Sequence, residues 1–87
     1  MKRWSIIFKV LGNINRLKII KLLSGGSRLS VSEIASQLKI SHKATSKHLI
    51  TLHHLDVLHS VGSEGHVFYF LNSDMPHDFE KTTNLLK

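Results

Sequence analysis

Apolar residues recur along this chain first at helical and then at strand-like intervals. Up to Leu55 they return every three or four residues, in segments separated by Gly12-Asn13, by residues 24–27 and by residues 39–41. Beyond Leu55 two short runs rich in Val, Phe and Tyr flank a Gly- and Ser-containing turn. The pattern therefore predicts four helices, then a hairpin, then a last helix.

The ends of these elements carry recognisable capping and turn residues. Asn13 can cap the second helix, Ser30 with Glu33 has the form of a capping box, and Ser41 can cap the fourth helix. Pro76 fits the first turn of the last helix, after Ser73 or Asp74. The predicted elements are helices at 3–11, 13–23, 31–38 and 41–55, strands at 57–61 and 66–71 around a turn at 62–65, and a C-terminal helix from about residue 74.

The third and fourth helices are joined by a short turn, which is typical of a helix-turn-helix. A two-stranded hairpin follows at once, so the predicted fold is mainly α with a β-hairpin wing, a winged helix-turn-helix. The 87 residues suffice for one domain, and we expect it to span 1–87 with terminal helices that support dimerisation.

The segment Ile40–Leu55 reads ISHKATSKHLITLHHL and divides into two faces when drawn as a helix. An apolar stripe carries Leu49 and Leu52. The opposite face is basic and rich in hydroxyls near its N-terminal end. An α-helix fits the major groove of DNA, where residues of its first turns reach base edges and phosphates. The predicted DNA-binding residues are Ser41, His42, Lys43, Ser46, Lys47 and His48, joined by His66 of the wing.

Several of these residues also have a simpler interpretation. Lys43 and Lys47 could form an ordinary solvated face, and Ser41 is a helix cap first. His48 lies among apolar residues, which favours a partly buried structural histidine. Ile50 faces outward, where it could touch a thymine methyl or pack under a loop. The whole arrangement, rather than any one residue, favours DNA.

Charge is distributed unevenly along the chain. Residues 1–47 carry ten basic residues and only Glu33 as an acid, whereas residues 48–87 carry two basic and five acidic residues. A basic surface built from the first half would attract polyanions. The alternative is that the net charge of +6 serves solubility alone, as in many small soluble proteins.

Several classes of function are disfavoured. The chain has no cysteine, so it has no disulfide, thiolate metal site or catalytic thiol. Lys9 interrupts the only signal-like stretch, and no apolar run approaches the roughly 20 residues that span a bilayer. No phosphate loop, nucleophile elbow or carboxylate pair indicates an enzyme. We expect a cytoplasmic non-enzyme with no membrane partner and no cofactor.

Three stretches and the wing resemble the ArsR-type winged-helix repressors, a family of small dimeric metal-responsive regulators. The stretches are LGNINRLKIIKLLS, LSVSEIASQLKIS and HKATSKHLITLHHLDVL, and the wing is VGSEGHVFYFLN. The likeness covers roughly residues 10–72. It implies a homodimeric transcriptional repressor that binds double-stranded DNA and whose first and last helices pair across the dimer. Candidate dimer residues are Trp4, Ile7, Phe8, Leu11, Phe79, Leu85 and Leu86, which could equally be intramolecular core.

The chain departs from the family pattern in two places. The family's Cys-x-Cys metal pair is replaced by Ser30 and Ser32, and hydroxyls are poor ligands for soft metals. The other histidines and carboxylates, including Asp74, do not form a complete ligand set, so we expect no metal site, and the inducer is unknown. The wing offers only His66, beside Glu64, where the family often has arginines.

Two rival functions follow from these departures. A winged helix that binds protein rather than DNA would explain the weakly charged wing and the exposed Ile50. A module that binds RNA is a variant of the same idea. Salt-dependent retention on duplex DNA separates DNA binding from both.

Overall fold

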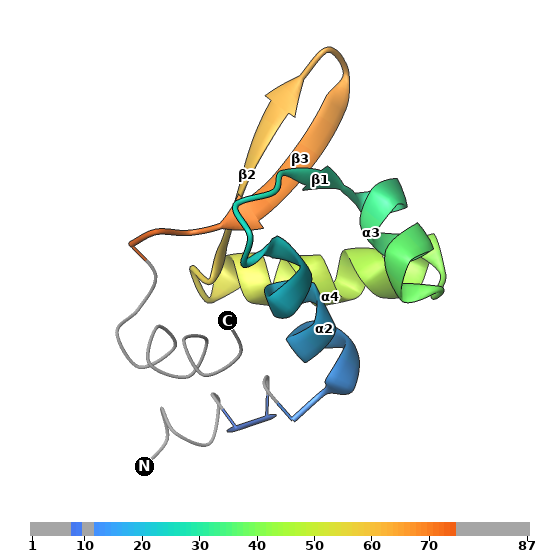
Figure 1. The fold of residues 1–87 in the computed structure, drawn as a ribbon, viewed down its shortest axis with the longest axis vertical. Coiled ribbons are helices and arrows are strands. Elements are labelled where there is room, and N and C mark those ends of the chain that lie inside the picture. Colours follow the sequence, from blue (N-terminus) through green and yellow to red (C-terminus); the bar gives the residue numbers. More distant parts are fainter. Residues whose placement is uncertain (1–7, 10–11, 75–87) are drawn as a thin grey trace.

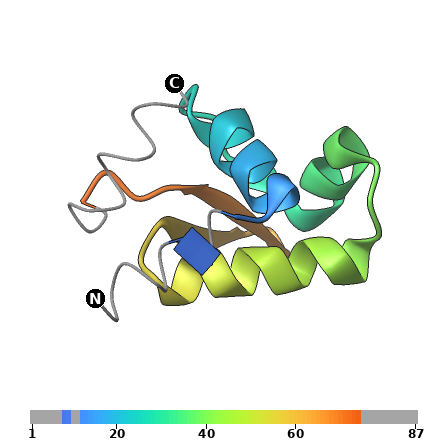
Figure 2. The same cartoon turned by 90° about the horizontal axis from the view of Figure 1, so that it is seen from below.

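The computed structural model describes residues 8, 9 and 12–74, which form a winged helix-turn-helix (Figure 1). Three helices pack around one apolar core (Figure 2), and an antiparallel hairpin extends from one side of them (Figure 1). The elements in chain order are α2 (Ile14–Leu23), β1 (Leu29–Ser30), α3 (Val31–Leu38), α4 (His42–His54), β2 (Leu58–Ser63) and β3 (His66–Leu71). The predicted fold class is confirmed.

Local hydrogen bonds start each helix where the sequence predicts it. The Asn13 side chain accepts from the amides of Asn15 and Arg16, at 2.9 and 3.3 Å. At α3 the capping box is complete, because the Ser30 hydroxyl accepts from the Glu33 amide and the Glu33 carboxylate accepts from the Ser30 amide. The hydrogen bonds with Ser30 lower the pKa of Glu33, so the carboxylate of the capping box stays ionised at neutral pH.

The core consists of the apolar faces of the three helices and the base of the wing. From α4 it takes Leu49 and Leu52, both fully buried, as the predicted stripe requires. Burial of apolar surface of this kind is the main favourable term in folding. The other buried apolar members are Ile19, Ile20, Leu23, Ile34, Val57 and Leu58.

The wing differs from the prediction in its strands. The hairpin is present, but β1 adds a third strand, so the sheet order is β1-β3-β2 and Leu29 pairs with Tyr69. Strand β2 runs to Ser63 rather than ending at Val61. The turn is limited to Glu64 and Gly65, whose φ angles of 51° and 80° are both positive, as in a two-residue type I′ hairpin.

The end of α4 is joined to the wing by a buried polar residue, Asn72, that the sequence pattern did not predict. Asn72 is 5% exposed and donates from its side chain to the carbonyl of Asp56, at 2.8 Å. Its amide bonds the carbonyl of Val57 at 3.0 Å. These bonds hold the left-handed Asp56, φ 60°, at the turn that leads into β2.

Two predicted elements lie mostly or wholly outside the described residues. Of the helix predicted at 3–11, only Phe8 and Lys9 are described, and both are helical. The helix predicted from about residue 74 lies outside. No helix within the described residues is long and apolar enough to cross a membrane.

Candidate nucleic-acid interface

Helix α4 is fixed by its cap and by its buried side. The Ser41 hydroxyl accepts from the Ala44 amide at 3.0 Å, and the buried Thr45 donates its hydroxyl to the Ser41 carbonyl at 2.9 Å. With Thr45, Leu49 and Leu52 buried against the rest of the domain, the rotation of α4 about its axis is set. Its opposite face must therefore be the one that meets solvent.

That opposite face carries most of the predicted DNA-binding residues. His42, Lys43 and Lys47 are exposed, and Ser46 is half-buried. The positive end of the helix dipole lies at the same end of α4 as these side chains. The first turns of α4 therefore present two ammonium groups, an imidazole and a hydroxyl to solvent, with no acidic residue in the first turn.

A cleft joins the start of α4 to the tip of the wing. It has a volume of about 270 Å³ and brings His42 of α4 and His66 of β3 to one place, beside Ser32 of α3. Hydroxyl and imidazole groups suit an anionic oxygen better than an apolar ligand. The lining residues are Ser30, Val31, Ser32, His42, Gly65, His66 and Val67.

His48 is placed differently from the other predicted site residues. It is half-buried, and burial first and the positive charge of Arg16 second lower its pKa. The Nε of Arg16 is itself buried without a hydrogen-bond partner among the described residues. His48 therefore lies on the flank of α4 that faces α2 and favours the neutral imidazole, which agrees with the structural interpretation.

This lowered pKa predicts a loss of stability in acid. The unfolded chain takes up the His48 proton near the ordinary value of 6.5, whereas the folded chain takes it up only at a lower pH. The contribution of neutral His48 to the free energy of unfolding is thus complete above pH 6.5, and it is lost as the pH falls through the pKa of the folded state. From about pH 7.5 to about pH 5.5 we expect the wild type to lose more unfolding free energy in urea titrations than H48Q.

An NMR titration of the His48 imidazole supplies the matched control. R16Q removes the repelling charge, so it should move the His48 pKa back toward 6.5. An unchanged pKa in R16Q would contradict the assigned electrostatic cause.

The wing has a cation that the sequence pattern did not predict. The guanidinium of Arg28 lies 4.5 Å from the ring centroid of Phe70, within the range of a cation–π contact. Arg28 is exposed just before β1, and only the pairing of β1 with β3 brings it to the sheet. The sole signal in the sequence was a basic residue two positions before a cap.

The predicted dimer residues are almost all outside the described part of the chain. Phe8 is described and is 70% exposed. The others, Trp4, Ile7, Leu11, Phe79, Leu85 and Leu86, lie outside the described residues. Within residues 8, 9 and 12–74, no three His, Asp or Glu side chains gather closely enough to hold a metal ion.

Comparisons with known proteins identify the relatives of this chain. The family model described as "Bacterial regulatory protein, arsR family" matches residues 13–60. The cadmium resistance transcriptional regulatory proteins CadC of Listeria innocua serovar 6a and of Lactococcus lactis subsp. lactis are each 38% identical over 66 residues. That match covers 76% of this chain and 56% of each CadC, so the chain spans little more than half of these relatives.

Solved structures with a similar fold include further regulatory proteins. Reduced HlyU from Vibrio cholerae N16961 superposes with a TM-score of 0.80 at 28% identity, covering 98% of this chain and 85% of that one. The homodimeric winged helix-turn-helix DNA-binding domain Mb0332 from Mycobacterium bovis superposes with a TM-score of 0.77 at 20% identity, covering 98% and 75%. The second likeness concerns the fold alone.

Proposed function

Because this chain belongs to the ArsR family of bacterial regulatory proteins, we propose that it is a sequence-specific repressor that reads double-stranded DNA with α4. The family is one of transcriptional regulators rather than enzymes. The observation that carries the proposal is the exposed, cationic first half of α4 next to the wing. Such a repressor acts in the cytoplasm, where bacterial DNA lies.

The proposal assigns different roles to the residues of α4. Lys43, Ser46 and Lys47 contact base edges or phosphates in the major groove, since side chains in the first turns of a recognition helix reach furthest into it. Ile50, which is 53% exposed further along the same face, meets a thymine methyl. For His48, which is half-buried and feels the charge of Arg16, the proposal is a structural role rather than a contact with bases.

The cleft between α4 and the wing receives the sugar-phosphate backbone. Ser41 already accepts a hydrogen bond at the helix cap, but its hydroxyl hydrogen is free to be donated to a phosphate. His42 and His66 approach the same backbone from two elements. Contacts of this kind set position and register, whereas α4 supplies sequence preference.

We further propose that the active form is a homodimer, paired through the segments before α2 and after β3. Mb0332 is described as a homodimeric domain of this fold. The residues proposed for the contact are the seven named above for the dimer. A two-fold dimer predicts half-sites about 34–36 Å apart, one helical turn of DNA.

The proposed repressor does not use the thiolate metal chemistry that a cadmium regulator suggests. The chain has no cysteine, and the Ser30 hydroxyl accepts from the Glu33 amide at 3.2 Å. Neither Ser30 nor Ser32 supplies a soft ligand. The proposal therefore includes no thiolate-bound metal as an effector.

Selection of bound duplexes from a random pool tests the proposal. A dyad-symmetric consensus bound more tightly than unrelated duplex and than RNA is the supporting result. Binding of all duplexes alike, or preference for RNA, would instead favour the rival module that binds protein or RNA, for which the exposed Ile50 is the structural argument.

A further inference from the structure

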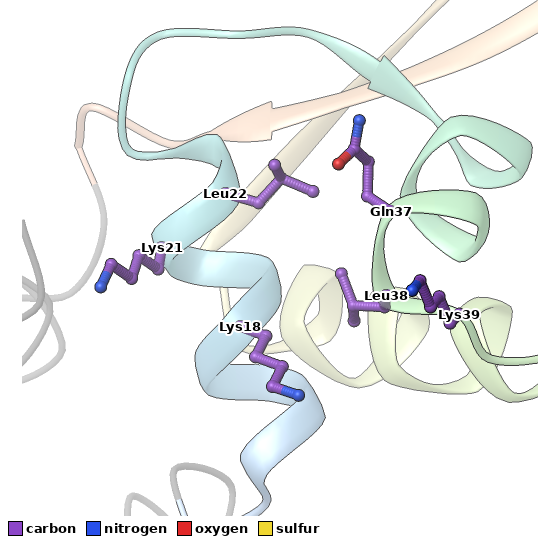
Figure 3. A pocket seen from close by; sticks show the side chains of 6 residues that line it. All are labelled: Lys18, Lys21, Leu22, Gln37, Leu38 and Lys39. Carbon is purple, nitrogen blue, oxygen red and sulfur yellow. The ribbon is translucent and has the colours of Figure 1, made fainter.

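A second basic surface lies between α2 and α3, apart from the exposed face of α4 (Figure 3). It is a hollow of about 420 Å³ that is open to solvent along most of its wall. Its lining residues are Lys18, Lys21 and Leu22 of α2, Gln37 and Leu38 of α3, and Lys39 of the turn that follows. We refer to these six residues as the α2–α3 hollow.

The hollow has an apolar floor and polar edges. Leu22 and Leu38 point into it from opposite helices, and both also pack against the core. Lys18 from α2 and Lys39 from the end of α3 border one edge of the hollow from its two sides, with Leu38 between them, whereas Gln37 lies at the other edge (Figure 3). Lys21 points to the far flank of α2. An occupant would meet two ammonium groups, an amide and two leucine side chains.

The positive charge of this edge has no acidic residue nearby in the sequence. The only acid among residues 1–47 is Glu33, and its carboxylate is held by the Ser30 amide at the opposite end of α3. Lys39 adopts φ 58°, a left-handed conformation that favours glycine or asparagine. Helix termination alone therefore does not explain a lysine at this position.

The hollow and the exposed face of α4 lie on different sides of the molecule. The buried residues of α4 face the core that α2 and α3 also enclose, so its exposed face points away from them. Figure 2 shows α2 and α3 on one side of α4. An occupant of the hollow would leave the first turns of α4 free.

We propose that the α2–α3 hollow docks an acidic, amphipathic segment of a partner protein while α4 stays available to DNA. Carboxylates of the segment pair with Lys18 and Lys39, and its apolar side chains cover Leu22 and Leu38. A protein segment fits better than a small molecule, because sites for small ligands enclose about 70–90% of the ligand surface and this hollow is open.

Two charge reversals test the docking site against the proposed DNA-binding face. The probe is a fluorescein-labelled synthetic peptide that repeats Glu, Leu and Asp, titrated with the full chain and followed by anisotropy. K18E/K39E should weaken peptide binding about tenfold or more, because like charges then face each other. K43E/K47E, with the same change in net charge, should leave peptide affinity unchanged.

The same variants keep this proposal separate from the proposed repressor function. K18E/K39E should retain affinity for the selected duplex, whatever the outcome for K43E/K47E. A second pair, K18A/K39G, guards against misfolding, since glycine relieves the positive φ at this turn. It should also lose peptide affinity while melting at no lower temperature than the wild type.

Three results would overturn the docking proposal. The first is a peptide affinity equal in wild type, K18E/K39E and K18A/K39G. The second is an equal loss of peptide binding in K43E/K47E, which would mean a response to net charge only. The third is a loss of duplex binding in K18E/K39E as large as that in K43E/K47E, which would make the hollow part of the DNA interface. A probe with Gln for Leu should bind more weakly, and equal binding would remove the role of Leu22 and Leu38.

Discussion

K43E/K47E is expected to lose at least about 100-fold in affinity for the selected duplex at moderate salt. Both lysines are exposed on the first turns of α4, so the change replaces two cations by two anions where phosphates and guanine edges approach. Because neither side chain belongs to the core, the fold should be unaffected. Anisotropy titrations against the labelled duplex measure the loss.

The salt dependence of the same titrations tests the physical cause. Each phosphate that a lysine neutralises adds roughly −0.9 to the slope of log affinity against log salt. Neutral K43Q/K47Q should therefore have a slope shallower by up to about two units. K18E/K39E is the charge-matched control, and an equal loss of duplex affinity there would contradict the assignment of DNA binding to the lysines of α4 alone.

The second large effect concerns the side of α4 that carries no charge. Leu52 is fully buried in the core, so L52A should lower the free energy of unfolding by about 2–5 kcal/mol, through lost apolar contact and the cavity left behind. That is a large share of the roughly 5–15 kcal/mol that stabilises a typical domain. Urea unfolding with an unchanged m-value measures it.

Ile50 supplies the control on the same helix. It is 53% exposed, so I50A should change stability by less than about 0.5 kcal/mol. Equal losses in L52A and I50A would contradict the orientation of α4. Toward DNA the order should be reversed. I50A should weaken duplex binding, because it removes a side chain from the proposed groove-facing surface, whereas folded L52A should keep its affinity.

The helices were predictable because their signals are local. The period of Leu49 and Leu52 identified the buried side of α4, and the three-residue spacing of Ser30 and Glu33 identified a capping box whose two hydrogen bonds are both present. Such patterns depend only on residues one helical turn apart. The two short apolar runs around a turn that contains Gly and Ser likewise located the wing.

The third strand was not predictable for the opposite reason. β1 has two residues, and Ser30 within it also serves as the cap of α3, which is the signal that the sequence displays. Its pairing with Tyr69 and Phe68 depends on how the chain returns from the far end of the domain. The predicted turn of the wing, residues 62–65, was too long. The observed turn depends on a positive φ at Glu64, and glutamate does not usually adopt that conformation.

The candidate sites were predictable only as lists of residues. His42 and His66 were each singled out from the sequence, but their shared cleft exists only because the wing folds back toward α3 and α4. The hollow that joins Lys18 to Lys39 and the contact of Arg28 with Phe70 arise in the same way. Contacts between residues far apart in the sequence cannot be predicted from local patterns. The buried side and the charged side of a single helix can be.

The most direct measurement of the central claim is an amide NMR titration of the isotope-labelled full chain with its selected duplex. If the basic face of α4 enters the major groove, the largest shifts will fall on residues 41–47 and on the turn at Glu64 and Gly65, with little change around Lys18 and Leu22. Shifts concentrated on α2 and the C-terminal end of α3, with Lys43 and Lys47 unmoved, would contradict the account.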